Sequence, residues 1–332
     1  MKKISTLMCM LLAIISAGAQ NGTGQRWAVV ELSAIYMRAD ADYESALETQ
    51  EIMGTVVEIV EEKGYWRKIV SPQPYTAWCT EKGLVEMDAK ELEAYKTAAK
   101  CMYTGLYGHV FIRPSFKAGT VCDLVGGDIM RFVRKKGRWT EVLLPSGRKG
   151  WVPSKELRMH EGFISIAKGE GNSSSVTEKQ TEAIIAEATK LVGSPYLWGG
   201  MTAKGVDCSG LVRISYLMNG IHLPRNASQQ IYCGDPVRMD MDERFWKDEE
   251  REDKEAFRKE MQQRIRHLQR GDLVFFGTPK TLLRKQKVTH VGIYIGEGKI
   301  IHSSHMVRIN SLIPGENDYY ENSHRLLGAR RL

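Results

Sequence analysis

The fold of this chain is decided by the sequence YLWGGMTAKGVDCSGL, residues 196–211. Its glycine-rich first part favours irregular backbone, and apolar residues recur at helical spacing from Cys208 until Gly220. We therefore predict a helix with Asp207 as its N-cap and Gly220 after its last turn. Cys208 then lies in the first turn, where unpaired N–H groups and the helix dipole favour a thiolate. The alternative is that Cys208 is a small buried apolar residue.

Two downstream histidines extend this candidate site. His290 and His302 lie in neighbouring β-rich segments, which Glu297, between two glycines, joins as a hairpin turn. A loop centred on Glu297 places His302 opposite Gly292, with His290 a diagonal neighbour on the same face, about 7–8 Å away. One ring can then act as a base while the other orients it. A loop one residue longer or shorter would place the rings on opposite faces of the sheet.

Five motifs occur in order over the C-terminal part of the chain. They are YLWGG at 196–200, DCSGL at 207–211, PRNASQQ at 224–230, GDLVFF at 271–276 and HVGIY at 290–294. Together they resemble the NlpC-type cell-wall cysteine peptidases. The whole chain is similar to the γ-D-glutamyl-L-diamino acid endopeptidases of the dipeptidyl-peptidase VI type. This resemblance implies an α+β fold, in which a papain-like peptidase domain with a helix packed on an antiparallel sheet follows two small all-β SH3-like barrels.

The resemblance also implies roles for the catalytic residues. Cys208 would attack the γ-carbonyl of D-glutamate, His290 would transfer its proton to the leaving amine, and His302 would hold the ring of His290. The Cys208 backbone N–H and Tyr196 would stabilise the oxyanion. The alternative for Tyr196 is aromatic packing beside Trp198.

Further residues match substrate-binding positions of that family. Asp207 and Ser209 correspond to residues that contact the D-glutamate carboxyl region, although capping the helix is an equally ordinary role. Tyr75 corresponds to a tyrosine of the first β module that helps to recognise the free amine of L-alanine.

Two acidic residues of the family pattern are missing from this amine site. Ala46 stands where a glutamate is expected, and Asn226 stands where the family carries aspartate. A buried amine needs a carboxylate partner, which Glu44 or Glu48 could supply from neighbouring positions.

The composition limits the class of protein. Residues 1–19 combine Lys2 and Lys3, an apolar run and a small-residue cleavage pattern, which predicts a signal peptide and a periplasmic or secreted protein. The five cysteines after it are scattered and odd in number, so neither a disulfide scaffold nor a structural zinc site is expected. The net charge of +7 suits an anionic wall polymer, or no partner at all.

The chain divides into repeated β modules and a third domain. Short strands with close turns predict a barrel at 20–88, and a second set at 105–160 repeats the pattern, which indicates an internal duplication. A linker helix is predicted at 89–104 and a polar linker at 161–180. The peptidase domain takes up 181–332 and contains a charged insertion at about 236–268, interpreted as a solvated helix or as a lid.

We therefore expect a cysteine peptidase that hydrolyses the γ-D-glutamyl–L-diamino acid bond of peptidoglycan stem peptides with a free N-terminus. The diamino acid, diaminopimelate or lysine, stays open. No cofactor, nucleic acid or stable membrane insertion is expected. No metal is expected either, because no further metal-binding side chains accompany His302 and His305. One alternative is a same-fold endopeptidase that cuts capped or cross-linked stems in intact peptidoglycan. Another is an inactive peptidoglycan-binding protein.

Overall fold

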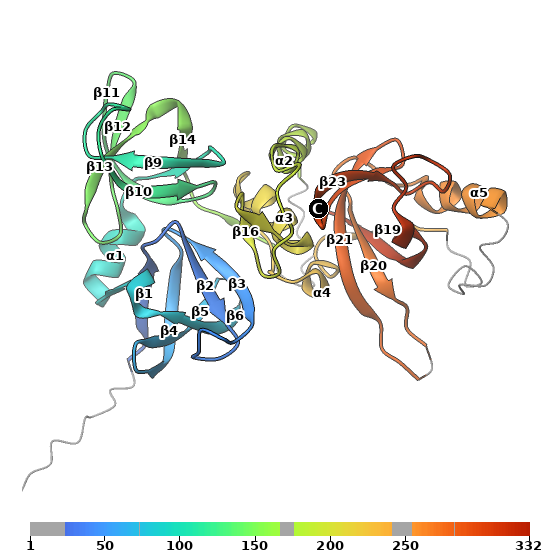
Figure 1. Ribbon diagram of the computed structural model, residues 1–332, viewed down its shortest axis with the longest axis horizontal. Helices are drawn as coiled ribbons and strands as arrows, with labels where there is room; N and C mark the ends of the chain where they lie inside the picture. The colour runs from blue at the N-terminus through green and yellow to red at the C-terminus, as the bar shows by residue number, and fades with distance from the viewer. Residues whose placement is uncertain (1–23, 73, 167–175, 241–253, 282) are drawn as a thin grey trace, which may run out of the picture.

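The computed structural model describes residues 24–72, 74–166, 176–240, 254–281 and 283–332. The predicted export signal, part of the 161–180 linker and residues 241–253 of the predicted insertion lie outside these ranges. Two all-β modules lie at one end of the molecule, helices α2 and α3 lie in the middle, and a six-stranded sheet forms the other end (Figure 1).

The first module is a seven-stranded antiparallel sheet with the order β3-β2-β6-β5-β4-β1-β7. Its strands are β1 (Arg26–Val30), β2 (Ala34–Arg38), β3 (Leu47–Ile52), β4 (Val56–Lys63), β5 (Trp66–Ser71), β6 (Tyr75–Thr80) and β7 (Leu84–Met87), with the 3-10 turn η1 (Glu81–Gly83) before β7. Alternating side chains from most of these strands meet in one small apolar core.

The second module repeats this topology, with the order β10-β9-β13-β12-β11-β8-β14. Its strands are β8 (Lys100–Tyr103), β9 (Tyr107–Phe111), β10 (Thr120–Val125), β11 (Ile129–Lys136), β12 (Trp139–Leu143), β13 (Lys149–Pro153) and β14 (Leu157–His160), with η2 (Ser154–Glu156) before β14. The same seven-strand order in both modules supports the internal duplication inferred from the sequence.

A helix joins the modules, but it is shorter than predicted. Helix α1 (Ala89–Thr97) begins with a capping box at Asp88. The chain then enters β8, which pairs with β11 and β14. The second sheet therefore starts at Lys100, inside the range 89–104 predicted as a linker.

The third domain packs helices on an antiparallel sheet of order β19-β24-β20-β21-β22-β23. The strands are β19 (Asp235–Val237), β20 (Leu273–Thr278), β21 (Lys287–Gly296), β22 (Lys299–Ser304), β23 (Met306–Ser311) and β24 (Leu326–Arg331). The helices are α2 (Glu178–Lys190), α3 (Cys208–Leu217), α4 (Ala227–Gln230), α5 (Lys254–Ile265) and the 3-10 turn η5 (Glu321–Arg325). Two short pairs, β15 (Ile164–Ser165) with β18 (Ile221–His222) and β16 (Met201–Thr202) with β17 (Gly205–Val206), flank α3.

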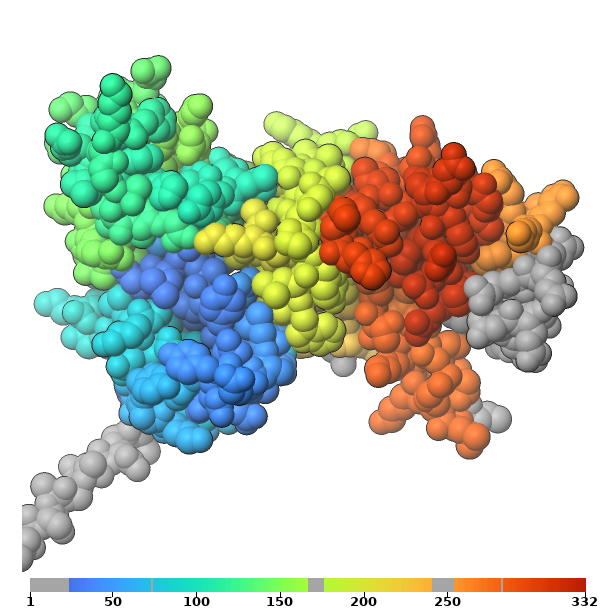
Figure 2. All heavy atoms as spheres, viewed as in Figure 1, coloured from blue at the N-terminus to red at the C-terminus, as the bar shows by residue number. Residues whose placement is uncertain are grey.

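The largest apolar core joins all three domains. It contains α2, α3 and one face of the sheet, together with Ile52, Met102, Val125 and Ile129 from the front modules. The modules are therefore packed against the third domain as a continuous body (Figure 2). None of the helices among the described residues has the length and apolar character needed to cross a membrane.

Helix α5 corrects the interpretation of the insertion. Its residues Phe257, Met261 and Ile265 are buried in a second core on the opposite face of the sheet, with Phe276 and Tyr320. The described part of the insertion is thus a core helix, not a solvated one, and it lies at the end of the molecule farthest from the front modules (Figure 1).

Candidate active site

Helix α3 presents Cys208 as its first residue. The Asp207 side chain accepts the Gly210 N–H at 2.7 Å, which confirms Asp207 as the N-cap. Position 210 requires glycine because a Cβ there would overlap the carbonyl oxygen of Gly200. This close approach fixes the glycine-rich segment against the start of the helix.

The Cys208 thiol is buried, with 8% of the residue exposed. Burial, and after it the charge of Asp207, raises the pKa of Cys208 to about 11, and hydrogen bonds from the N–H groups of Val291 and Ser209 only partly offset this. Desolvation therefore outweighs the helix N-terminus, which by itself favours a thiolate. Cys208 is a neutral thiol at neutral pH and needs a base to become a nucleophile.

The predicted histidine hairpin is confirmed. Ile293 pairs with Ile301, the register predicted for a loop centred on Glu297, whose φ is 53°. His290 and His302 therefore share a face, and His290 Nε2 lies 2.7 Å from His302 Nδ1.

Asn310 determines which atoms of this histidine pair carry protons. Asn310 Nδ2 donates to the Asp318 carbonyl at 2.7 Å, so its Oδ1 faces His302 Nε2 at 2.9 Å. An amide oxygen only accepts, so His302 carries its proton on Nε2 and its Nδ1 accepts from His290 Nε2. His290 is left with a bare Nδ1, the form that a general base requires.

Both imidazoles are neutral near pH 7. Burial, followed by the charges of His302 and Arg308, lowers the pKa of His290 to about 3. Burial also lowers the pKa of His302 to about 4, although the bond to Asn310 opposes this. The N–H of Val291, the residue after His290, contacts the Cys208 sulfur. The structure thus pairs His290 with His302 and places the Cys208 thiol at the backbone N–H of the residue that follows His290.

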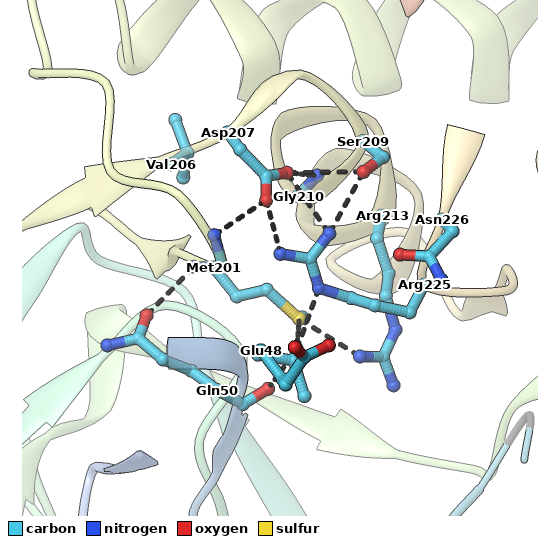
Figure 3. A network of polar contacts seen from close by, with 12 residues as sticks. Glu48, Gln50, Met201, Val206, Asp207, Ser209, Gly210, Arg213, Arg225 and Asn226 are labelled. Atoms are coloured by element: carbon cyan, nitrogen blue, oxygen red, sulfur yellow. Dashed lines mark hydrogen bonds and ion pairs between the residues drawn. The ribbon is translucent and has the colours of Figure 1, made fainter. Parts of the chain in front are cut away.

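A buried polar network supports the Cys208 end of α3 (Figure 3). Arg225 donates to both carboxylate oxygens of Asp207 at 3.0 and 2.5 Å and to Ser209 Oγ at 2.9 Å. The remaining Asp207 contacts are with Ser209 Oγ and the N–H groups of Gly199 and Gly210. Both oxygens of the Asp207 carboxylate already accept hydrogen bonds from protein donors, and this geometry favours the capping role of Asp207 over direct substrate contact.

The first module contributes residues beside this network. Tyr75 donates to Glu48 Oε2 at 2.5 Å, and Asn226 hydrogen-bonds to Tyr75. Burial, followed by the bond to Glu48, raises the pKa of Tyr75 to about 12. Glu44 lies exposed on the β2–β3 loop. Of the two acids considered as replacements for the missing carboxylates, Glu48 is therefore the one next to Tyr75 and Asn226.

Two tyrosines border Cys208 from other segments. Burial, followed by the charges of Cys208 and Asp207, raises the pKa of Tyr196 above its usual range. The Tyr320 ring lies 4.6 Å from the His302 ring and 5.6 Å from the His290 ring, between ring centres. Trp198, by contrast, is 68% exposed, so close packing on it does not account for Tyr196.

The roles of three residues in this region were not identified from the sequence. Arg225 forms the ion pair with Asp207, Asn310 accepts from His302, and Tyr320 packs beside the two histidines. Arg225 stands inside the quoted PRNASQQ motif and could have been found there, whereas Asn310 and Tyr320 belong to no motif. No group of three or more metal-binding side chains occurs among the described residues, and the five cysteines described are free thiols.

The sequence around this site matches a known protein family. Residues 193–327 match the NlpC/P60 family. The Gamma-D-glutamyl-L-lysine dipeptidyl-peptidase of Bacillus cereus is 29% identical over 303 residues, covering 86% of this chain and 75% of the relative. Dipeptidyl-peptidase 6 of Lysinibacillus sphaericus is 25% identical over 293 residues, covering 86% of this chain and 91% of the relative.

Solved structures show the same fold. A crystal structure of an NlpC/P60 family protein from Bacillus cereus has a TM-score of 0.68 at 22% identity, covering 92% of this chain and 99% of that one. An NlpC/P60 endopeptidase from Photobacterium damselae has a TM-score of 0.60 at 15% identity, and the match covers 91% of this chain and 72% of that one. The similarity therefore extends over the front modules as well as the third domain.

Proposed function

We propose that this chain, whose residues 193–327 match the NlpC/P60 family, is a cysteine peptidase that hydrolyses the γ-D-glutamyl–L-diamino acid bond of peptidoglycan stem peptides. The preferred substrates are fragments that begin with a free L-alanine amine. The observation that carries this proposal is the position of Glu48 and Tyr75, which project from the first module beside Asn226 and the start of the Cys208 helix. Two relatives that match most of the chain are named as dipeptidyl-peptidases, one of them as a γ-D-glutamyl-L-lysine dipeptidyl-peptidase.

The reaction follows from the protonation states of the site. As Cys208 Sγ attacks the γ-carbonyl carbon, its proton passes to the bare Nδ1 of His290. The Cys208 N–H and the Tyr196 hydroxyl stabilise the oxyanion. His290 then protonates the leaving amine, and a thioester remains on Cys208. Water, deprotonated by His290, hydrolyses the thioester and restores the thiol.

The first module accounts for the free N-terminus. A γ-linked dipeptide whose γ-carbonyl lies at Cys208 would place its terminal ammonium near the Glu48 carboxylate. That carboxylate supplies the charge that Ala46 and Asn226 lack. A capped or longer peptide would meet the wall formed by the first module, which opposes the alternative of an enzyme for cross-linked stems.

The surrounding architecture is interpreted accordingly. We infer that the two front modules are SH3-like barrels and that the third domain is papain-like, since the helix bearing the cysteine packs on a sheet bearing the base. The signal peptide predicted at 1–19 supports export to the periplasm or the exterior, where stem peptides occur.

Mass spectrometry of L-Ala-γ-D-Glu-diaminopimelate after incubation with wild type and Cys208→Ala tests this function. We expect L-Ala-D-Glu and free diaminopimelate from wild type alone, and no cleavage of the α-linked isomer. Absence of cleavage by wild type would overturn the substrate assignment and favour a binding protein.

A further inference from the structure

Arg308 lies beside the catalytic histidines, and the described part of the chain gives it no counter-charge. On the antiparallel pair β22–β23 it stands directly opposite His302, so the two side chains share a face of the sheet. His290, His302 and Arg308 thus follow one another on β21, β22 and β23. Its charge lowers the pKa of both histidines, as expected for a close cation.

The guanidinium of Arg308 has an unsatisfied atom. Its Nε is buried and has no hydrogen-bond partner, and no ion pair joins Arg308 to a carboxylate within the described ranges. Arg213 Nε also lacks a hydrogen-bond partner among the described residues, but the guanidiniums of the buried Arg213 and Arg225 are paired with Glu51 and Asp207. A partly buried cation without a partner is costly, and here it also opposes protonation of the base. An incoming anion would remove both costs.

A second guanidinium borders the same place. The charges of Arg308 and Arg325 both act to lower the pKa of Tyr320, whose ring meets the His302 ring edge-on. Arg325 Nε donates to the Gly277 carbonyl at 3.3 Å, and the described residues offer it no ion-pair partner either. Arg308 and Arg325 therefore form a dibasic site around Tyr320.

The direction of the reaction indicates that this dibasic site meets the leaving half of the substrate, the diamino acid. Glu48, Tyr75 and Asn226 lie on the acyl side, near the start of α3. The base donates its proton to the leaving amine, so groups that flank the histidines on the sheet meet the leaving diamino acid.

We propose, on the basis of the function above, that Arg308 and Arg325 bind the carboxylates of the leaving diamino acid and make the enzyme selective for diaminopimelate over lysine. Diaminopimelate, released from a tripeptide, carries two carboxylates for two guanidiniums. Lysine carries one carboxylate, and its side-chain ammonium would face two like charges, whereas the distal ammonium of diaminopimelate shares its carbon with a carboxylate. Guanidinium forks suit carboxylates through paired N–H···O bonds.

The test compares kcat/KM for L-Ala-γ-D-Glu-diaminopimelate and L-Ala-γ-D-Glu-lysine in wild type, Arg308→Gln, Arg308→Lys and Arg325→Gln. Arg330→Gln, on β24 of the same sheet, is the matched control. We expect wild type to prefer the diaminopimelate peptide by about tenfold or more, as one charge-assisted bond provides. Arg308→Gln should bring the ratio close to one, Arg325→Gln should reduce it, Arg308→Lys should keep part of it, and Arg330→Gln should leave it unchanged.

The outcomes separate the two proposals. Equal cleavage of both peptides by wild type would overturn the selectivity and leave the peptidase function standing. If Arg308→Gln slows both peptides by the same factor, Arg308 only tunes the histidines, and carboxylate binding is overturned. If wild type cleaves neither peptide, the proposed function fails, and this inference fails with it.

Discussion

Glu51 of the first module and Arg213 of helix α3 form an ion pair of 3.0 Å in which the side chains are only 2% and 1% exposed. The same guanidinium contacts His222 Nε2 at 2.8 Å and the Met201 sulfur at 2.9 Å. Since α3 begins at Cys208, this pair links the module that forms one wall of the site to the helix that carries the nucleophile. The front module is thereby a structural part of the active site.

Glu51→Ala should destabilise the protein by about 3–5 kcal/mol, because it leaves the Arg213 charge buried without a partner. Urea unfolding would measure this loss. The control is Glu62→Ala, which removes a surface partner of Arg26 with side chains 42–44% exposed and should cost less than about 1 kcal/mol. A similar cost for both substitutions would contradict the structural role of the buried pair.

Asn310→Leu should lower kcat by about 10- to 100-fold, because the histidine pair loses the acceptor that fixes its protons. Asn310→Asp also accepts from His302 Nε2 and should retain much more activity. The pH–rate profile adds a second measurement, since the carboxylate introduced by Asn310→Asp raises the pKa of His302 and should move the acidic limb upward. An unchanged kcat in Asn310→Leu would exclude this positioning role.

Alkylation of Cys208 by iodoacetamide should be slow at pH 7 and rise about tenfold per pH unit up to about pH 10. With a pKa of about 11, only about one part in ten thousand of the thiol is ionised at pH 7. Peptide mapping by mass spectrometry would follow Cys208 separately from the other cysteines. A rate that is independent of pH between about 5 and 8 would instead indicate a preformed thiolate–imidazolium pair.

Stability should decrease in mild acid. Burial lowers the pKa of His222 to about 3, with Arg213 adding to the effect, and lowers those of His290 and His302 to about 3 and 4. An unfolded histidine titrates near 6.5, so below that pH the unfolded state binds more protons than the folded state. The free energy of unfolding is therefore constant above about pH 6.5 and falls as the pH is lowered toward about 3.

Each buried histidine should contribute about 2 kcal/mol of this loss by pH 5. Urea midpoints at pH 7.5 and 5, compared between wild type and His222→Asn, would measure the share of His222. The variant should lose less stability on acidification. The same pH dependence in both proteins would show that His222 is not held neutral.

The local features of the site could be predicted from the sequence because each depends on neighbouring residues. The cap at Asp207 and the hairpin at Glu297 are of this kind, and so are the repeated strand patterns. The protonation of Cys208 could not be predicted, because the burial that raises its pKa involves β21 and other segments far along the chain. Asn310 likewise acquires its role only from strand pairing, which brings it to His302.

The choice between Glu44 and Glu48 also depended on tertiary structure. Both were possible replacements for the missing acids, but the path of β3 places Glu48 against Tyr75, while Glu44 lies exposed before the strand. Glu44 and Glu48 are equally close to Ala46 in the sequence, so the sequence alone could not show that Glu48 replaces the missing carboxylate.

The most direct test of the account compares kcat/KM for L-Ala-γ-D-Glu-diaminopimelate with a free and with an acetylated N-terminus, in wild type and Glu48→Gln. We predict that wild type prefers the free peptide by about 30-fold or more, and that Glu48→Gln loses most of this preference because the ammonium loses its partner. Equal cleavage of the free and acetylated peptides by wild type would contradict the role assigned to the first module.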